Sequence, residues 1–440
     1  MNVELPWGKA FLSLTLPDTW QVHLPQRLDI SCGKKPDETE IVYEALQKPI
    51  GAAKLSDMAL QDKRILIIVD DNTRPTPASR FFHLVVNELK TACARSENIT
   101  VLTALGIHTP MTEDEIAEKI GPANLSKISW FNHDSFDPGT HHDFGKTQRG
   151  TPVVLNRKVA ESDLVILIGM IEPHLWAGFG GGLKNLFPGV AAAHAIGHHH
   201  GMISEPPYWF NRVGSDPAEN LFRRDIEEMR QLITADIFII NVLLDEKDRI
   251  TAAYAGDPVE AHREGIACNR KKAGIPLQGR MDAVIVNSQP MNINFKQSMK
   301  CVANALPALK PGGVVMAFLK AERGLDDIPL PDKPPPLVIL KAILKTIGKA
   351  RVMGFLNLVK KGLDVEQKFL TYYSMRLISD YTVFCYVPSL TPVEVRHLGF
   401  FPYSATPSEV IEKGAAIMPK NAQVAVFPDG GATFPVIEGA

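Results

Sequence analysis

The side chains best suited to chemistry lie in loops that each follow a short apolar run of the sequence. The first loop, Asp-Asp-Asn-Thr-Arg-Pro-Thr-Pro at 70–77, contains Asp71 and Arg74, and a guanidinium can hold a carboxylate or phosphate with two parallel hydrogen bonds. An Asx-type turn that only caps the next helix is also an open interpretation. The next two loops place His108 and His174 at the same position relative to their own apolar runs. A single histidine is usually structural, but two in equivalent positions could exchange protons with one substrate near neutral pH.

A glycine-rich segment comes directly after the loop of His174. It resembles a phosphate-binding P-loop, but Leu183 separates the last glycine from Lys184, and Asn185 stands where Ser or Thr is required, so a Walker motif is rejected. Glycines still allow backbone amides to approach a bound group, and nests of amides attract anions. Lys184 could contact a phosphate, attach a group covalently, or be an ordinary surface lysine. The glycines that could form such a nest are Gly180, Gly181 and Gly182.

Two further clusters could hold a metal or a substrate. His198, His199 and His200 are consecutive, and imidazoles suit nickel, copper and zinc, but three adjacent side chains cannot all face one ion, so at most one or two would bind a metal. Gln297 and Lys300 are three residues apart on a predicted helix and share one of its faces. Lys296 lies on the same helix, and an ordinary basic helix surface remains an alternative there.

Unalternating apolar runs recur along the chain and predict strands that are buried on both faces of a parallel sheet. Ligands bind outside the carboxyl ends of such strands, which is where the loops above begin. Thr112 and Glu115 predict a helix that starts with a capping box. The predicted fold class is therefore α/β. The apolar runs lie at 64–69, 99–103, 163–168, 236–243 and 282–287.

A domain boundary is predicted near 265–280, where a helical segment leads to Pro276 and a new strand. This divides the chain into an N-terminal α/β domain at 1–270 and a C-terminal α/β domain at 271–440, whose final segment is expected to return to the first domain. A proline cluster at 328–336 precedes a basic helical segment and suits a linker or a lid hinge.

Composition restricts the class of protein. The chain has 47 Lys and Arg against 49 Asp and Glu, a net charge of -2, which argues against a broad nucleic-acid or anionic-membrane surface. No apolar run is long enough to span a bilayer, and the first 20 residues make a poor signal peptide. Five scattered cysteines without a CxxC pair fit reduced thiols. A cytoplasmic globular protein is expected, and the sequence leaves open whether it forms a homo-oligomer.

Taken together, these motifs resemble the lactate racemase family, whose members carry a nickel pincer nucleotide. The long segment IEPHLWAGFGGGLKNLFPGVA at 171–191 is the most specific match. Further matching segments, in chain order, are DDNTRPTP at 70–77, GIH at 106–108, NHD at 132–134, HGM at 200–202, AGDPVEAHR at 255–263, NINFKQSMK at 292–300 and VFPDGG at 426–431. The resemblance implies two α/β domains with the active site in the cleft between them.

The resemblance also implies a racemase or epimerase of 2-hydroxy acids. Lys184 would carry the cofactor, a nickel-pyridinium-3-thioamide-5-thiocarboxylic acid mononucleotide made by separate maturation proteins, and His200 would ligate the nickel. His108 and His174 would be paired acid/base residues that serve a hydride transfer to the cofactor. The cofactor-binding residues would include Asp71, Thr73, Arg74, Gly180, Gly181 and Gly182, and the substrate would meet Arg74, Gln297, Lys300 and Lys296.

Two departures from lactate-type members suggest a different substrate. Those members tend to have Tyr before the glutamine, whereas this chain has Lys296, and the segment 340–375 contains no Trp. A 2-hydroxy acid larger or more polar than lactate is therefore expected, with Lys296 meeting a second acidic or hydroxyl group. A non-catalytic homologue that only binds nickel or the nucleotide cofactor is the alternative. An NAD-dependent oxidoreductase lacks support, because no predicted strand leads into G-x-G-x-x-G.

Overall fold

The structure is a computed structural model that describes residues 1–25, 37–204, 211–245, 247–326, 328, 330, 333, 336–359 and 365–437. The chain forms two compact units. The first unit comprises Asp29–Met202 and Ser215–Lys272, and the second comprises Met1–Leu28, Ile203–Gly214 and Ala273–Ala440. Each unit is built around its own mainly parallel sheet, which confirms the predicted α/β class.

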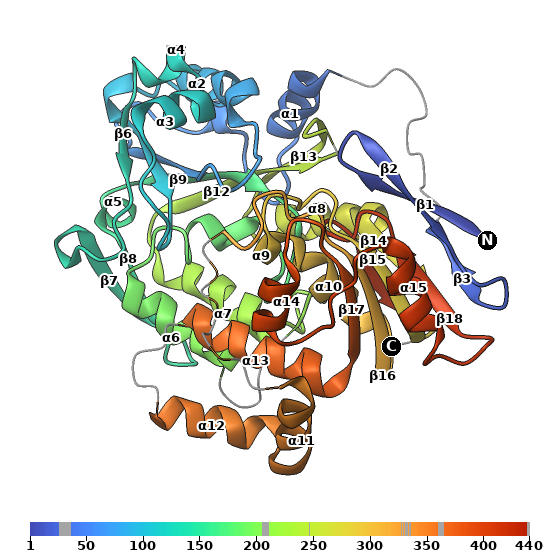
Figure 1. The fold of residues 1–440 in the computed structure, drawn as a ribbon. Coiled ribbons are helices and arrows are strands. Elements are labelled where there is room, and N and C mark those ends of the chain that lie inside the picture. The colour runs from blue at the N-terminus through green and yellow to red at the C-terminus, as the bar shows by residue number, and fades with distance from the viewer. Residues whose placement is uncertain are drawn as a thin grey trace. The chain divides into compact units, whose positions relative to one another are not determined.

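The sheet of the first unit has the strand order β13-β12-β9-β4-β5-β6. Figure 1 labels β13, β12, β9 and β6 of this sheet. Neighbouring strands are parallel except for the pair β12 and β13. Because β4 lies between β5 and β9, the loops that follow these three strands begin side by side at one edge of the sheet. The strands are β4 (Ile65–Asp70), β5 (Ile99–Ala104), β6 (Ser129–Asn132), β9 (Leu164–Met170), β12 (Asp236–Leu244) and β13 (Ile250–Gly256).

Both faces of this sheet are covered, as the apolar runs predicted. All six residues of β4 are buried, and Ile65, Ile67 and Val69 pack with side chains of α1, α2 and α3 on one face. The helices of the unit are α1 (Glu38–Gln47), α2 (Phe82–Thr91), α3 (Glu113–Ile120), α4 (Pro122–Leu125), α5 (Arg157–Ala160), α6 (Ala193–Ser204), α7 (Leu221–Glu228) and α8 (Glu260–Ala273). Short pairs of strands are β7 (His141–Lys146) with β8 (Pro152–Asn156), and β10 (Pro173–His174) with β11 (Gly178–Phe179).

The second unit has a parallel sheet in the order β17-β16-β15-β18-β3, and the antiparallel hairpin of β1 and β2 packs on it together with α15. Its strands are β1 (Asn2–Trp7), β2 (Ala10–Thr15), β3 (Gln21–His23), β14 (Gly274–Leu277), β15 (Met281–Asn287), β16 (Leu309–Phe318), β17 (Thr382–Tyr386), β18 (Gln423–Phe427) and β19 (Phe434–Ile437). Its helices are α9 (Phe295–Ser298), α10 (Lys300–Ala305), α11 (Leu337–Ile347), α12 (Lys349–Val359), α13 (Val365–Asp380), α14 (Pro392–Leu398) and α15 (Pro407–Ala415).

The chain path differs from the expected division at both ends. The first 25 residues were assigned to the N-terminal domain, but β3 adds to the edge of β18 and so belongs to the second unit. The final segment was expected to return to the first domain, yet β19 pairs with β14 inside the second unit. Both pairings join segments far apart in sequence, which local apolar patterns do not reveal. None of the helices in the described ranges is long and apolar enough to cross a membrane.

Candidate active site

The loop after β4 orients His108, which follows β5. Nδ1 of His108 lies 2.6 Å from Oδ2 of Asp71, and the other carboxylate oxygen accepts from the amide and hydroxyl of Thr73. Burial favours a higher pKa for Asp71, but the hydrogen bonds from His108 and Thr73 outweigh it and hold this pKa below its usual value. Asp71 is therefore ionised and accepts the Nδ1 proton, so that neutral His108 presents an unprotonated Nε2 from a half-exposed side chain.

A buried lysine supports this loop from inside the unit. Nζ of Lys119, on α3, lies 2.7 Å from a carboxylate oxygen of Asp70 and donates to the backbone carbonyls of Asp71 and Arg74 at 3.0 and 2.9 Å. Helix α3 starts with the predicted capping box of Thr112, which fixes where Lys119 enters the sheet edge. The strand end and the next four residues are therefore held by one cation.

An ion pair joins the loop after β4 to the loop after β9. Nη1 of Arg74 lies 3.2 Å from Oε1 of Glu172, and both side chains are mostly buried. The Glu172 carboxylate raises the pKa of Arg74, with smaller contributions from Asp71, while burial opposes the shift. Since Glu172 precedes His174 by two residues, the loops that carry His108, Arg74 and His174 form one connected cluster at the carboxyl edge of the sheet.

His174 differs from His108 in how its ring is held. Nδ1 of His174 accepts from the backbone amides of Trp176 and Ala177, both at 3.2 Å. Neutral His174 therefore carries its proton on Nε2, where it can donate a hydrogen bond but cannot accept a proton. The two histidines were expected to be an equivalent acid/base pair. The two rings are therefore held in different tautomers, with Nδ1 of His108 donating to Asp71 and Nδ1 of His174 accepting from two amides.

The three consecutive histidines of α6 have three different environments. His198 is exposed, and His199 is fully buried with Nε2 donating to the carbonyl of Phe222 at 3.1 Å. His200 is partly exposed, and its Nδ1 donates to the carbonyl of Ile196 at 3.0 Å, which leaves the Nε2 lone pair for a ligand. His200 thus combines partial access with a tautomer that leaves Nε2 for a metal, whereas His199 is buried and its Nε2 is taken up by Phe222.

Trp176 links His200 to the catalytic candidates. The ring centroid of Trp176 lies 5.9 Å from that of His174 and 5.6 Å from that of His200, with both pairs edge-on. The indole therefore contacts both the candidate metal ligand and the candidate catalytic histidine.

The glycine-rich turn is fixed from within the unit by three buried side chains. Fully buried Arg223, on α7, donates to the carbonyls of Ala177, Phe179 and Gly181. Burial lowers the pKa of Arg223 to about 10, which leaves it charged at neutral pH. Nε2 of His262 donates to the carbonyl of Gly180 at 2.7 Å, and Oδ1 of Asn241 accepts from the amide of Gly182 at 2.7 Å.

These bonds change the role expected of the glycines. The amide of Gly180 donates to the carbonyl of Glu172, and that of Gly182 donates to Asn241, so these two amides cannot form an anion-binding nest. A Cβ at Gly182, where φ is +60°, would lie 2.9 Å from the ring of His262. The glycines are required for close packing, which holds the short helix Gly182–Asn185 and thereby Lys184.

The residues of the first unit fit a cofactor that brings its own metal donors. Among the described residues, no three His, Cys, Asp or Glu side chains converge as a metal site. His200 offers one imidazole nitrogen, a donor that suits nickel, and Lys184 offers an amine on a rigid turn. A single protein ligand and one attachment point suit an organometallic group better than a bare ion.

The expected substrate residues of the second unit occupy the helix after β15. The side chain of Asn294 caps α9 by accepting from the amide of Gln297 at 2.9 Å, and Lys300 begins α10. Lys296, Gln297 and Lys300 are all partly exposed, whereas their neighbours Phe295 and Ser298 are buried. The single helix predicted here is divided at Met299, and the three expected residues are on the partly exposed side of the two short helices.

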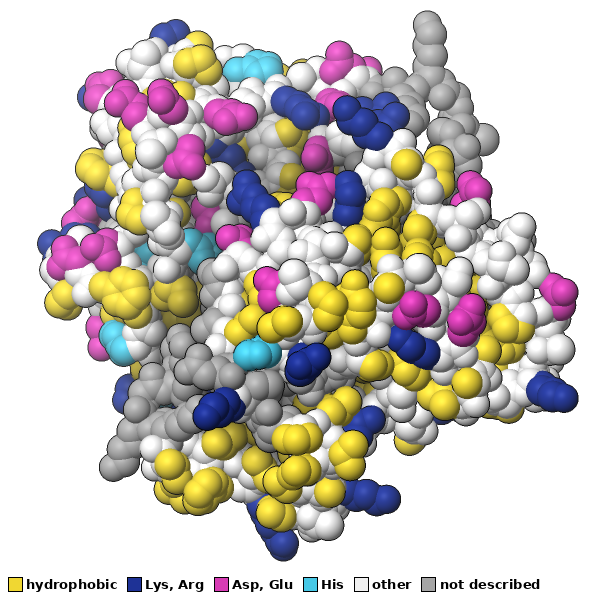
Figure 2. Space-filling model, viewed as in Figure 1, with side chains coloured by type: hydrophobic (Ala, Val, Ile, Leu, Met, Phe, Trp, Pro, Cys, Tyr) yellow, Lys and Arg dark blue, Asp and Glu magenta, His cyan; other side chains and the backbone are white. Residues whose placement is uncertain are grey.

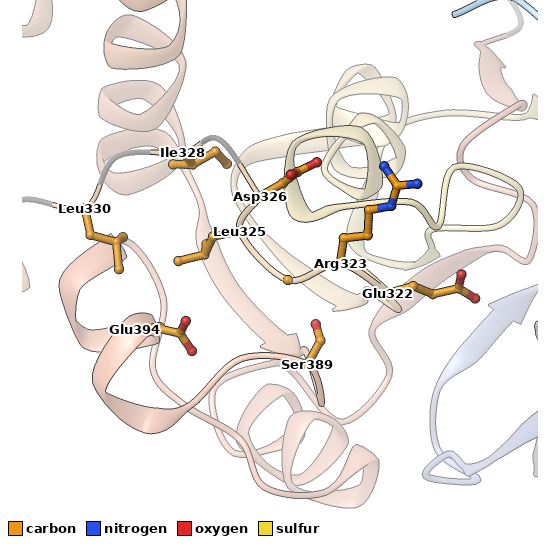
Figure 3. Close-up of a pocket in the computed structure, with 9 residues that line it drawn as sticks. Glu322, Arg323, Leu325, Asp326, Ile328, Leu330, Ser389 and Glu394 are labelled. Atoms are coloured by element: carbon orange, nitrogen blue, oxygen red, sulfur yellow. The ribbon is translucent and has the colours of Figure 1, made fainter.

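A cavity of about 740 Å³ in the second unit is lined by none of the expected site residues. Figure 3 shows Leu325, Ile328 and Leu330 on one side of it, and its other lining residues include Glu322, Arg323 and Glu394. Glu322 is paired with Lys320, and Glu394 is taken up in the capping box of α14. The lining of this cavity therefore includes none of the residues expected at the candidate site.

Comparison with known proteins decides the family. Residues 7–208 match the family described as Lactate racemase N-terminal domain. The lactate racemase of Thermoanaerobacterium thermosaccharolyticum is 31% identical over 327 residues, which cover 73% of this chain and 75% of that protein. The chain belongs to the lactate racemase family. The lactate racemase of Lactiplantibacillus plantarum is 29% identical over 73% of this chain and 75% of its own length.

Solved structures agree with membership of the lactate racemase family. The lactate racemase apoprotein from T. thermosaccharolyticum matches with a TM-score of 0.82 and 26% identity, covering 99% of this chain and 100% of that one. A Thermotoga maritima protein shares the fold with a TM-score of 0.56 and 19% identity, over 92% of this chain and 99% of its own. As a member of the lactate racemase family, the chain is an isomerase of the racemase type.

Several residues of the site were not assigned from the sequence. Glu172, Trp176 and His262 lie inside the segments that carry the family resemblance, and this position was the one indication in the sequence that they belong to the site. The sequence contains no such indication for Arg223 and Lys119, because a basic residue in a predicted helix is ordinarily placed on the surface. Their function here is to hold backbone carbonyls of the site loops.

Proposed function

We propose that this chain is a racemase or epimerase that inverts C2 of a 2-hydroxy acid with a nickel pincer nucleotide. The observation that carries the proposal is the hydrogen bond of 2.6 Å between Asp71 and His108. It prepares a base at a sheet edge where Arg74 and His174 also lie. Non-catalytic binding of a cofactor would not need a carboxylate to orient a histidine in this way.

Lys184 and His200 are proposed to hold the cofactor, Lys184 through a covalent bond and His200 through Nε2 to nickel. Asp71, Thr73, Arg74 and the three glycines at 180–182 are proposed to surround it. When bound, the group would supply an acceptor for the hydrogen on C2, which is too weakly acidic to leave as a proton beside an anionic carboxylate. Separate maturation proteins would have to make it.

His108 is proposed to take the hydroxyl proton of the substrate at Nε2. Asp71 then stabilises the imidazolium, as a buried carboxylate does for an adjacent histidine. His174 donates a hydrogen bond from Nε2 in the arrangement described. It becomes the base for the opposite enantiomer only after its ring rotates and releases the amides of Trp176 and Ala177.

The substrate carboxylate is proposed to bind Arg74, Gln297 and Lys300. One oxygen of Glu172 pairs with Arg74, and a guanidinium has five N–H donors, so this pair does not exhaust it. Lys296 is proposed to meet a second acidic or hydroxyl group. The expected substrate is therefore larger or more polar than lactate.

The deciding experiment uses the full chain co-expressed with cofactor-maturation proteins. Mass spectrometry of peptides should show added mass at Lys184, and metal analysis should show nickel. Enantiomer interconversion is then followed by polarimetry across a panel of 2-hydroxy acids. If the loaded protein inverts none of these acids, the chain is the non-catalytic homologue. If lactate is the fastest substrate, the role proposed for Lys296 is contradicted, whereas the proposed racemase activity is not.

Substitutions separate catalysis from cofactor binding. His108→Ala and His174→Ala should each lower turnover about 10²- to 10⁴-fold, the usual contribution of a general base, while the mass at Lys184 and the nickel content persist. His83→Ala, at an exposed position of α2, is the matched control and should change neither. Unchanged turnover in both site variants would contradict the assignment.

A further inference from the structure

Helix α11 exposes large apolar side chains along its length, and α12 exposes them in its second half. Val338, Phe355 and Leu358 are 79%, 63% and 75% exposed. The other large apolar residues exposed on this pair of helices are Ile339, Ile343, Ile347 and Val359. Soluble proteins rarely expose so many large apolar groups together, and such patches usually mark a contact with another surface.

The exposed residues follow the helical period in both helices. In α11 they recur as 338, 339, 342, 343, 345, 346 and 347, and in α12 as 350, 351, 354, 355, 358 and 359. The opposite sides are buried at Leu344 and Met353, where the two helices pack on α13. Each helix thus has an inner apolar side that stabilises the unit and a second, outer apolar stripe that no described residue of the unit covers.

The charge of this segment is of one sign. Between Leu337 and Val359 the sequence contains Lys341, Lys345, Lys349 and Arg351 and no Asp or Glu. Lys349 forms an ion pair with Asp380 of α13, and Lys345 and Arg351 are exposed. Figure 2 shows hydrophobic side chains gathered over these helices with Lys and Arg around them. The net charge of -2 for the whole chain conceals this local excess.

We propose that α11 and α12 form a docking surface for an anionic lipid bilayer, lying in its interface without crossing it. Helices with an outward apolar stripe and flanking lysines bind such interfaces by apolar burial together with attraction to anionic lipids. On the helical wheel Lys341 and Lys345 border the stripe of Val338 and Ala342, so their ammonium groups can reach lipid phosphates while the apolar groups insert.

Two other occupants fit this surface less well. A second copy of the chain docked through the same patch would bring like charges together. A partner helix would need an acidic polar face to match the lysines beside the stripe, whereas anionic lipids present that charge over their whole surface. A cationic and strongly apolar surface matches an anionic bilayer better than either.

Vesicle co-sedimentation of the full chain tests the proposal. Binding should be strong to vesicles of phosphatidylcholine mixed with phosphatidylglycerol, weak to phosphatidylcholine alone, and reduced by added salt. Phe355→Asp and Leu358→Asp should each weaken binding about tenfold, because each removes the insertion of one large apolar group. Phe136→Asp and Phe11→Asp are matched controls, since these phenylalanines are 71% and 67% exposed elsewhere, and both should bind normally.

Charge variants test the electrostatic part. Lys341→Gln and Lys345→Gln should each weaken binding to the anionic vesicles about fivefold, whereas Lys127→Gln and Lys420→Gln, at exposed positions elsewhere, should not. All variants should keep the melting temperature of the parent protein.

Several results would overturn the proposal. They are absence of binding to anionic vesicles, binding that persists in the Phe355→Asp/Leu358→Asp double variant, and capture of polyglutamate without capture of vesicles, which would assign the surface to an acidic protein. A dimer in sedimentation velocity that Phe355→Asp abolishes, without vesicle binding, would likewise assign it to a second copy.

Discussion

Replacing Lys119 by methionine removes the cation that holds the first active-site loop. The side chain is 8% exposed, and its Nζ contacts a carboxylate oxygen of Asp70 at 2.7 Å and the carbonyls of Asp71 and Arg74 at 3.0 and 2.9 Å. Methionine has nearly the same length and fills the same space, so the substitution tests the charge and its bonds with little loss of packing.

The expected loss is about 4 kcal/mol at neutral pH. Removing one partner of a buried ion pair usually costs about 3–5 kcal/mol, because the other charge stays buried without compensation. The two carbonyl bonds belong to the same ammonium group, so they overlap with this figure and are not added to it. An exposed lysine such as Lys127 should lose under about 0.5 kcal/mol on the same change to methionine.

The loss of stability caused by Lys119→Met should be smaller at acidic pH. The direction of this pH dependence follows from the pKa of Asp70. Burial raises the pKa of Asp70, while the charge of Lys119 opposes that rise. Without Lys119 the folded-state pKa rises further above the unfolded value. A raised pKa means that the folded state takes up the proton more readily, so the penalty is fully present above the folded pKa and disappears as pH falls toward the unfolded value, near 4.

Urea denaturation followed by far-ultraviolet circular dichroism at pH 7.5 and pH 5 measures both effects. The Lys119→Met variant should recover part of its lost stability at pH 5. The Asp70→Asn/Lys119→Met double variant should lose less than the sum of the two single variants. A loss below about 1 kcal/mol at pH 7.5, or one of equal size at both pH values, would refute the reasoning.

Three further substitutions test the supports of the site. Gly182→Ala should lose about 2–3 kcal/mol in thermal denaturation, because φ is +60° and its Cβ would meet the ring of His262 at 2.9 Å, whereas Gly197→Ala, in a helix with no atom nearby, should be neutral or stabilising. Thr112→Ala should lose about 1 kcal/mol of stability in the same assay by removing the cap of α3. In the Arg223→Lys variant, the single side-chain nitrogen cannot donate to all three carbonyls that the guanidinium contacts, so hydrogen exchange of the glycine-turn amides should become faster. Unchanged exchange would contradict the positioning role of Arg223.

The sequence predicted those features that depend on neighbouring residues. Continuous apolar runs marked β4, β5, β9, β12 and β15, because strands buried on both faces need apolar side chains at every position. The capping box of Thr112 was also confirmed, since its partners lie within one helical turn. Placing the candidate loops after parallel strands was sufficient to predict that they begin at one sheet edge.

The remaining features depend on contacts between distant segments. Arg223 reaches the glycine turn from more than 40 positions away, and Lys119 reaches Asp70 from about as far. The difference between His108 and His174 rests on which ring nitrogen a carboxylate or a pair of amides occupies. Residue type and spacing do not encode that choice, so the two histidines were predicted to have equivalent roles.

The pairing of β3 with β18 sets an order for synthesis and folding. Gln21 and Gln423 meet across this pair although they are 402 positions apart. Strand β3 is therefore synthesised about 400 residues before the strand on which it docks. Until β18 has been made, β3 has no strand to pair with and the hairpin before it lacks part of the sheet on which it packs. The second unit is consequently completed only when these two distant segments meet, and delayed docking leaves a bare edge of β18 open to aggregation.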